Sequence, residues 1–261
     1  MESARDDTGA AVDLHHPVRR VVSLVPSLTE AVAATKPEAI VGATNWCSRP
    51  TGLDVSRVRG TKNPDVEKVL ALVPDVVIAN AEENRETDLS RLREAGVAVW
   101  VTDIRTLPQA VTSLARLFTA CGWGVPDWLD TVHDVWGDLL GEPPPPERWA
   151  VIPIWRRPWM VIGRDTFGGD LLRRMGVGNI YATHEDRYPK VPLPELNSVP
   201  ADLVVLPDEP YAFTADDGPE SFPRLPAALL EGRHLTWYGP ALVEARAALA
   251  RQLTTLLPPG G

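Results

Sequence analysis

Short apolar runs alternate with amphipathic segments along most of the chain. Runs rich in β-branched residues predict strands at residues 21–25, 39–43, 75–79 and 98–102. Between and after them, apolar residues recur every three or four positions. This spacing predicts helices that begin near Ser27 and near Asn63–Pro64, and further helices over residues 87–95 and 107–120. Strands that alternate with helices in this way predict a parallel α/β sheet with right-handed crossovers.

A second α/β segment follows a proline-rich break. The helix predicted over residues 126–140 ends before Pro143–Pro146, a run that forms a stiff extended spacer. Beyond it we predict strands at residues 149–155, 159–162, 202–206 and 236–238, helices at 169–175 and 240–257, and an irregular stretch at 207–232. The predicted organisation is a disordered tail (1–18), an N-terminal α/β lobe (19–121), a helix with its Pro-rich spacer (122–147) and a C-terminal α/β lobe (148–261).

The charge balance excludes some classes of partner. The 261 residues include 35 acidic and 26 basic side chains, a formal net charge of −9, which disfavours binding to nucleic acid and electrostatic anchoring to a membrane. The sequence contains no run of about 18 apolar residues, so membrane insertion is not expected. We expect a monomer. Nine tryptophans against four tyrosines and four phenylalanines give a surplus of large flat rings.

The start of the chain bears on its cellular location. The first 18 residues lack the basic start and apolar stretch of a secretory leader. The two cysteines, Cys47 and Cys121, do not lie near the start of the chain, where a lipid anchor would be attached. As it stands, the sequence therefore predicts a cytoplasmic protein. It predicts an extracytoplasmic one if a leader has been removed.

Common catalytic and cofactor motifs do not occur in the sequence. It lacks GxGxxG after a strand, the P-loop, HExxH and GxSxG, and its five histidines are scattered. The two cysteines have no metal-ligand spacing. We therefore expect no catalytic residue, no metal ligand and no required cofactor.

Four segments carry a resemblance to a known family. They are VVSLVPSLTEAV (21–32), IVGATNWCSRP (40–50), GTKNPDVEKVLALVPDVVIA (60–79) and LTWYGPALVEA (235–245). In order and spacing the chain resembles the periplasmic cobalamin- and iron-siderophore-binding proteins of ABC importers, the helical-backbone type, over roughly residues 19–256. The resemblance implies two α/β lobes bridged by a single spine helix, with the ligand in the cleft between the lobes. It also implies a solute-binding protein that holds a small molecule, a corrinoid or a metal chelate, without chemistry, and that works with an ABC permease if exported.

The candidate ligand contacts lie in loops that follow the predicted strands. In open parallel sheets, ligands bind beyond the carboxyl ends of the strands. The first lobe supplies Pro26, Ser27, Asn45, Trp46, Cys47, Lys62, Asn63, Asn80, Glu83, Asn84 and Arg85, and the second supplies Trp155, Arg156, Trp159, Asp208, Glu209 and Tyr211. The resemblance implies cleft aromatics at Trp46, Trp155, Tyr188 and Trp237, whose rings suit a planar ligand. It also implies that Glu67 and Glu195 dock onto arginines of the permease.

Charged residues in these loops leave alternatives open. A cobalamin pocket would show aromatic and small residues where this chain has Lys62 and the loop Asn80–Arg85. Such charges favour a smaller polar ligand, anionic or zwitterionic, or pair with one another. The Cys47 thiol ligates cobalt or iron, acts as a nucleophile, or is a buried structural residue.

Two other functions remain open on the same scaffold. One is a cytoplasmic carrier, sensor or enzyme acting on a smaller polar ligand. In an enzyme, Glu82, Glu83, Asp208 or Glu209 would act as the general base, and Lys62 or Arg85 would hold an anion. The other is a purely structural or partner-binding role.

Overall fold

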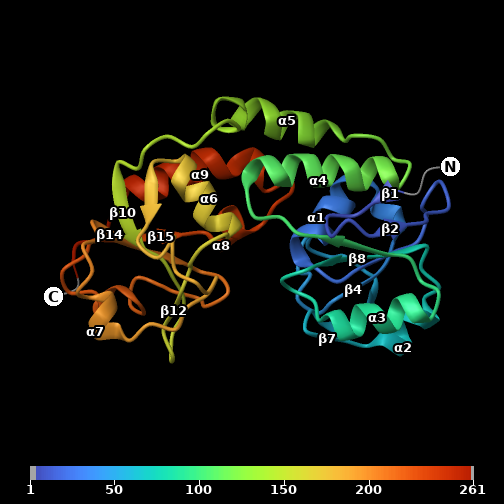
Figure 1. Ribbon diagram of the computed structural model, residues 1–261, viewed down its shortest axis with the longest axis horizontal. Helices are drawn as coiled ribbons and strands as arrows, with labels where there is room; N and C mark the ends of the chain where they lie inside the picture. The colour runs from blue at the N-terminus through green and yellow to red at the C-terminus, as the bar shows by residue number, and fades with distance from the viewer. Residues whose placement is uncertain (1–3, 260–261) are drawn as a thin grey trace. The chain divides into compact units, whose positions relative to one another are not determined.

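A five-stranded parallel sheet forms the centre of the first of two units in the computed structural model, which describes residues 4–259 (Figure 1). The strand order is β5 (Ser56–Arg57), β4 (Ile40–Ala43), β3 (Val21–Ser23), β8 (Val76–Asn80) and β9 (Val99–Thr102). The three strands β3, β8 and β9 are buried throughout, which explains their nearly continuous apolar sequence.

Helices cover both faces of this sheet. Figure 1 shows α1 (Pro26–Thr35) and α4 (Leu107–Ala120) on one side, and α2 (Val66–Ala71) and α3 (Glu86–Glu94) on the other. The apolar stripes of α2 and α3 pack on the sheet in one core cluster that includes Val69, Leu92 and Val77. The helix predicted over residues 107–120 has those bounds in the structure.

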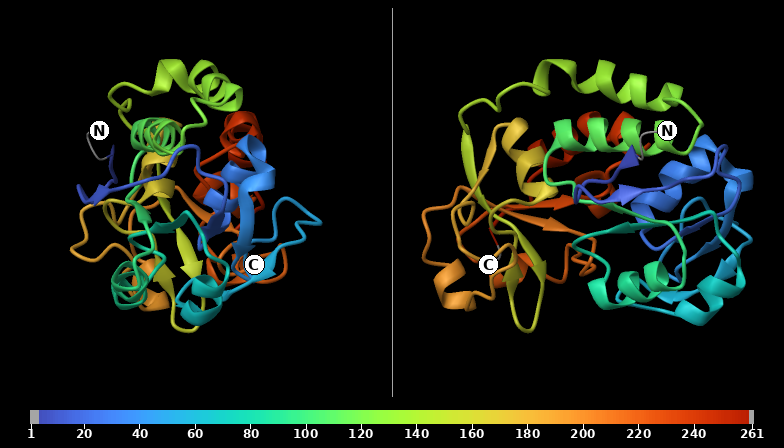
Figure 2. Two further views of the ribbon diagram at one scale, coloured as in Figure 1. Left: turned by 90° about the vertical axis from the view of Figure 1, so that its right-hand side faces the viewer. Right: turned by 45° about the vertical axis from the view of Figure 1, so that its right-hand side comes forward.

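The N-terminal segment is ordered, contrary to the disordered tail predicted over residues 1–18. Strands β1 (Ala4–Arg5) and β2 (Ala11–Val12) form a hairpin that lies beside α4 (Figure 2). Buried Asp6 accepts a hydrogen bond from the Val101 N–H at 3.1 Å, and Asp7 accepts one from Ser113 Oγ at 2.7 Å. Asp6 and Asp7 therefore attach this segment to β9 and α4. Residues 1–3 of the predicted tail and 260–261 of the predicted C-terminal lobe lie outside the described residues.

The second unit has a four-stranded parallel sheet of its own. Its order is β13 (Val177–Asn179), β10 (Arg148–Val151), β14 (Leu203–Pro207) and β15 (Ala227–Leu230). The helices of this unit include α6 (Phe167–Arg174), α7 (Leu193–Leu196), α8 (Gly232–Thr236) and α9 (Leu242–Thr254). A separate antiparallel hairpin, β11 (Pro153–Trp155) and β12 (Met160–Val161), extends away from the sheet of this unit (Figure 2).

Some predicted elements differ from the structure. Helix α1 begins at Pro26, so Ser27 lies inside it and is not its N-cap. Asn63–Pro64 form strand β7, which pairs with β6 (Arg59–Gly60), and α2 begins after Asp65, whose side chain caps it. The predicted irregular stretch 207–232 contains β15. The strand predicted at 236–238 is wrong, because Thr236 is the last residue of α8 and residues 237–238 are irregular.

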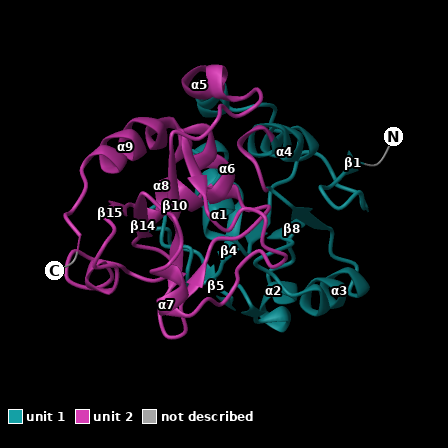
Figure 3. Ribbon diagram, turned by 60° about the vertical axis from the view of Figure 1, so that its left-hand side comes forward, with its two compact units in different colours: residues 1–104, 109–132, 238–240 teal, residues 105–108, 133–237, 241–261 magenta. Residues whose placement is uncertain are grey.

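The two units are interleaved along the sequence. Unit 1 consists of residues 1–104, 109–132 and 238–240, and unit 2 of residues 105–108, 133–237 and 241–261 (Figure 3). One passage from unit 1 to unit 2 lies within the helix α5 (Asp127–Trp136), which continues as a short 3₁₀ turn to Leu139. This division differs from the uninterrupted lobes predicted from the sequence, because residues 105–108 and 238–240 belong to the other unit.

None of the helices in residues 4–259 is long and apolar enough to cross a bilayer.

Candidate functional site

Loops from three parallel strands of unit 1 meet at the carboxyl-end edge of its sheet. Strand β3 leads into the start of α1, β4 leads into residues 44–47, and β8 leads into residues 81–85. Because parallel strands end at a common edge, the topology brings these loops together, as predicted. We use the name unit 1 face for the region formed by residues 26–27, 45–47, 61–63, 80–85 and Tyr238, which includes buried side chains that support its surface.

The loop after β8 is held by the side chains of two asparagines. Asn80 Oδ1 accepts the backbone N–H groups of Glu82 at 2.9 Å and Glu83 at 3.2 Å, while its Nδ2 donates to Thr102 Oγ1 at 3.1 Å. Asn84 Oδ1 in turn accepts the Asn80 N–H at 2.9 Å. Both asparagines are buried. They were predicted as ligand contacts, but their amide groups are used within the protein, where they fix the loop.

The hairpin β6–β7 braces this loop. Asn84 Nδ2 donates to the Thr61 carbonyl at 2.9 Å, and the Lys62 ammonium donates to the Glu82 carbonyl. Lys62 and Asn63 are exposed. The Lys62 charge therefore lies on the unit 1 face, with one of its three donors already used.

Trp46 is the largest exposed apolar group of the unit 1 face. Its side chain is 69% exposed, and a Cβ atom at Gly60 would lie 3.3 Å from its Nε1, so the indole borders the hairpin. The loop below the ring is fixed, because the Arg57 guanidinium donates to the carbonyls of Thr44 and Cys47 at 3.1 and 2.9 Å. A large flat ring is thus exposed on a rigid support.

Cys47 lies beneath this loop and does not reach the surface. Its side chain is fully buried, and its sulfur lies 3.0 Å from Thr29 Oγ1 and 3.1 Å from Thr44 Oγ1. Burial raises the pKa of the Cys47 thiol, which disfavours the thiolate that would bind a metal or attack a substrate. The prediction of Cys47 as a ligand contact is therefore wrong, and its structural alternative holds.

A segment from the far end of the chain completes the unit 1 face. Tyr238 is buried, and burial raises the pKa of its phenol well above the ordinary value, helped by the charge of Glu83. A Cβ atom at Gly239 would lie 3.3 Å from the Ser27 carbonyl oxygen. Tyr238 therefore lies close to the start of α1 and to Glu83.

Glu83 has an unusual electrostatic environment. Burial raises the pKa of its carboxyl to about 7, the neighbouring charge of Glu82 raises it further, and Lys62 opposes the shift. The Glu83 side chain is half-buried, and no residue in the described part of the chain donates a hydrogen bond to its carboxylate. Near neutral pH this carboxyl is present in both protonation states.

Unit 2 gathers three of its predicted aromatic residues, Trp155, Trp159 and Tyr211, into one cluster with Phe213. The Trp155 ring packs edge-on against Tyr211 at 5.7 Å between centroids, and the Trp159 ring stacks on Phe213 at 6.0 Å. Trp155 is 42% exposed, whereas Trp159 also packs edge-on against Phe222 at 5.4 Å. Of the two predicted tryptophans of this hairpin, Trp155 is the one with an exposed ring.

The predicted charged contacts of unit 2 are paired within that unit. Arg156 makes ion pairs with Asp217 and, at 2.6 Å, with Glu220, and its guanidinium lies over the Trp159 ring. Asp208 Oδ1 accepts the Gly232 N–H at 2.6 Å. The partners of Arg156 and Asp208 are thus residues of unit 2 outside the set of predicted contacts, so these contacts do not show the predicted charges pairing with one another.

Three further predicted residues lie in less accessible or separate places. Trp237 is only 8% exposed and donates through Nε1 to Glu209 Oε2 at 3.1 Å, so the prediction of an exposed ring at Trp237 is wrong. Tyr188 is half-buried, with the Arg187 guanidinium 6.0 Å from its ring centre. Arg85 is exposed immediately before α3.

The two predicted docking acids lie on different units and are both exposed. Glu67 lies in α2 and pairs with Arg91 at 3.3 Å. Glu195 lies in α7 next to the Tyr181 phenol, whose pKa burial raises to about 12 with a further contribution from Glu195. Their role on a permease stays a prediction.

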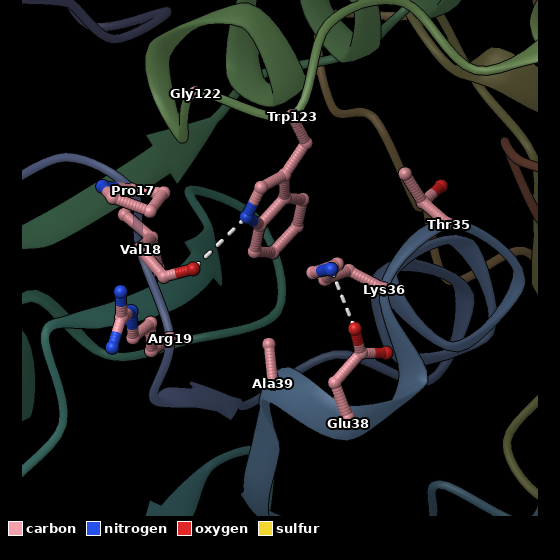
Figure 4. A pocket seen from close by; sticks show the side chains of 9 residues that line it. All are labelled: Pro17, Val18, Arg19, Thr35, Lys36, Glu38, Ala39, Gly122 and Trp123. Atoms are coloured by element: carbon pink, nitrogen blue, oxygen red, sulfur yellow. Dashed lines mark hydrogen bonds and ion pairs between the residues drawn. The ribbon is translucent and has the colours of Figure 1, made fainter.

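A separate hollow of about 660 Å³ lies at the opposite, amino-end edge of the unit 1 sheet (Figure 4). The Trp123 indole lines it and donates to the Val18 carbonyl at 2.9 Å, and Lys36 pairs with Glu38 at 2.5 Å. Most of its polar groups are thus already paired within the protein. Across residues 4–259 no three His, Cys, Asp or Glu side chains group as they would around a metal ion.

Sequence reasoning missed two residues that shape the unit 1 face, Arg57 and Tyr238. The role of Arg57 depends on hydrogen bonds to backbone carbonyls, which a sequence motif does not reveal. Tyr238 follows the predicted residue Trp237 directly. The Gly239–Pro240 pair after it indicates a turn, and this was the sequence signal that could have drawn attention to Tyr238.

Comparison with known proteins confirms the resemblance predicted from the sequence. The vitamin B12-binding protein of Vibrio cholerae is 30% identical over 103 residues, which cover 39% of this chain but only 37% of that relative's length. The solved structure of the periplasmic vitamin B12-binding protein BtuF of the same organism has a TM-score of 0.72 at 18% identity, covering 91% of this chain and 97% of that chain. A periplasmic heme-binding protein from Pseudomonas aeruginosa gives 0.71 at 24% identity, covering 92% and 95%.

These likenesses confirm the α/β fold expected from the sequence. No family model matches the chain. The proteins compared are described as binding proteins, so the alternative of a cytoplasmic enzyme gains no support from them.

Proposed function

We propose that this protein is a solute-binding protein that holds a planar or macrocyclic small molecule, a corrinoid, a heme or a metal chelate, without chemical change. The unit 1 face is the proposed ligand surface. The observation that carries the proposal is the Trp46 indole, 69% exposed on a loop fixed by Arg57. An exposed indole on a rigid loop is typical of a binding surface, because stacking on a flat ligand removes a large apolar area from water.

The comparisons support the class of ligand. The relative from V. cholerae is named for vitamin B12 and the structural neighbour from P. aeruginosa for heme, and both ligands are metal-containing macrocycles. On unit 2 we keep Trp155 as a proposed ligand contact, since its ring is exposed. We also keep Tyr211, which orients that ring.

Ligand titration tests this function. Cyanocobalamin and hemin are added separately to the purified protein, and binding is followed by calorimetry and by the visible spectrum. We expect at least one of them to bind, and Trp46→Ala to weaken that binding at least about tenfold with little change in the free energy of unfolding.

Trp149→Ala is the matched control. Trp149 is also a well-exposed tryptophan but lies in β10. The Trp149→Ala change should leave the affinity for the macrocycle unchanged. If neither macrocycle binds, or if both tryptophan variants weaken binding equally, the proposal is wrong.

We further propose that the protein works outside the cytoplasm and delivers its ligand to an ABC permease. The solved structures of similar fold are described as periplasmic proteins, which supports this location over the cytoplasmic one predicted from the sequence. Exposed Glu67 and Glu195 are the proposed docking residues. Fractionation of cells that express the native gene should find the protein outside the cytoplasmic membrane. Glu67→Ala with Glu195→Ala should reduce ligand uptake by proteoliposomes holding the cognate permease, while ligand affinity is retained.

A further inference from the structure

The unit 1 face combines the exposed indole of Trp46 with the carboxyl group of Glu83, to which no residue within 4–259 donates a hydrogen bond. The charged and titratable groups facing Glu83 come from three elements: Glu82 on the same loop, Lys62 on the β6–β7 hairpin and Tyr238 on the returning segment. Of these, Lys62 donates to the Glu82 carbonyl.

The neighbouring polar side chains are already committed. The Asn80 side chain is hydrogen-bonded to the N–H groups of residues 82 and 83 and to Thr102. The Asn84 side chain is hydrogen-bonded to the backbone of Asn80 and Thr61. The Glu83 oxygens therefore offer hydrogen-bond acceptors on a loop that cannot easily move away from a ligand.

We propose that Glu83 makes the unit 1 face select macrocyclic ligands whose edge carries amide or amine N–H groups, and reject ligands whose edge carries carboxylates. This inference rests on the proposed function and assigns its specificity to one residue. An N–H donor would give the half-buried carboxylate a charge-assisted hydrogen bond. A ligand carboxylate in the same place would face Glu82 and Glu83 with like charge in a partly desolvated setting.

The two ligand classes then respond to pH in opposite directions. An N–H donor binds best to the ionised carboxylate, so affinity for an amide-edged ligand rises as the pH rises through about 7. A ligand carboxylate binds best when Glu83 is protonated and can donate, so its affinity falls over the same range.

Cyanocobalamin and its monocarboxylic acids form a matched ligand set, because each acid differs from the parent by the hydrolysis of one amide to a carboxylate. Hemin, which carries two propionates, is a second carboxylate-edged probe. Dissociation constants are measured between pH 6.5 and 8 for the unmodified protein, Glu83→Gln, Glu83→Asp and Glu94→Gln. Glu94→Gln removes an exposed charge at the other end of α3 and serves as the control.

We expect the unmodified protein to prefer cyanocobalamin to at least one of its acids and to hemin. Glu83→Gln should shift this preference toward the carboxylate ligands by about tenfold. It should also remove the opposite pH slopes, while Glu83→Asp and Glu94→Gln keep them. A thermal unfolding curve for each variant shows whether it is folded.

The failure of this inference differs from that of the proposed function. Tighter binding of hemin than of cyanocobalamin by the unmodified protein would overturn the specificity of Glu83 and leave a solute-binding protein. Unchanged preference and unchanged pH slopes in folded Glu83→Gln would do the same. Absence of binding by every ligand of the set would overturn the proposed function and the inference together.

Discussion

Replacement of Asn80 by alanine should release the loop that carries Glu82 and Glu83. The Asn80 side chain is 3% exposed, accepts two backbone N–H groups of the loop and donates to Thr102. Each of these three hydrogen bonds contributes about 1 kcal/mol, so their loss should lower the free energy of unfolding by about 3 kcal/mol. That is a large part of the 5–15 kcal/mol typical of a folded domain.

Hydrogen exchange locates the effect within the protein. If about 3 kcal/mol is lost at the loop, the amides of Glu82 and Glu83 should exchange about 100-fold faster in Asn80→Ala. Urea unfolding gives the matching global change. Ligand affinity should fall as well, because the loop becomes mobile in the free protein.

Thr102→Val is the matched control for this change. It removes the partner of Asn80 Nδ2 but leaves both bonds from Asn80 Oδ1 to the loop. Because Thr102 Oγ1 also donates to the Ala79 carbonyl at 3.1 Å, the change should cost about 2 kcal/mol, and it should leave exchange at Glu82 and Glu83 slow. Equal exchange rates in Asn80→Ala and the unmodified protein would refute the role of Asn80 in holding the loop.

Three further changes test separate features. Val73 is exposed and has a left-handed backbone conformation, φ 46°, which is unfavourable for a β-branched residue. Val73→Gly should therefore raise the free energy of unfolding by about 0.5–1 kcal/mol, measured as a higher urea midpoint. Trp136→Phe should lower the free energy of unfolding by about 2–3 kcal/mol, because the buried indole loses its 2.8 Å bond to the Leu242 carbonyl. The raised pKa of Glu83 means that the folded protein binds the proton more tightly. The protonated Glu83 should therefore stabilise the unmodified protein relative to Glu83→Gln by up to roughly 3 kcal/mol. Urea unfolding should show this contribution complete below pH 4.5 and lost as the pH rises through about 7.

The pattern of apolar residues was sufficient to predict elements that carry this pattern within their own sequence. Helix α4 has an amphipathic pattern over its whole length, and β8 is a continuous apolar run, so both were found. Strand β7 was predicted as the start of a helix because Asn63–Pro64 satisfies the capping rules, while pairing with β6 decides the conformation. Strand β15 has only four residues, Ala-Ala-Leu-Leu, whose composition does not distinguish it from a helix.

The site was predictable as a set of loops but not residue by residue. Topology places residues 45–47 and 80–85 at one edge of the sheet, and that much follows from the order of strands and helices. Which side chain points inward does not, and Cys47 is buried while its neighbour Trp46 is exposed. Likewise, the partners of Arg156 lie more than 60 residues away along the chain, at Asp217 and Glu220, so its pairing could not be inferred from spacing.

The return of residues 238–240 to unit 1 has a consequence for synthesis of the protein on the ribosome. Most of unit 1 is complete once residue 132 has left the exit tunnel, but the segment that brings Tyr238 beside Ser27 and Glu83 emerges more than 100 residues later. Until then the nascent chain lacks part of the unit 1 face. A truncated product that stops within unit 2 would thus contain Trp46 and Glu83 without Tyr238.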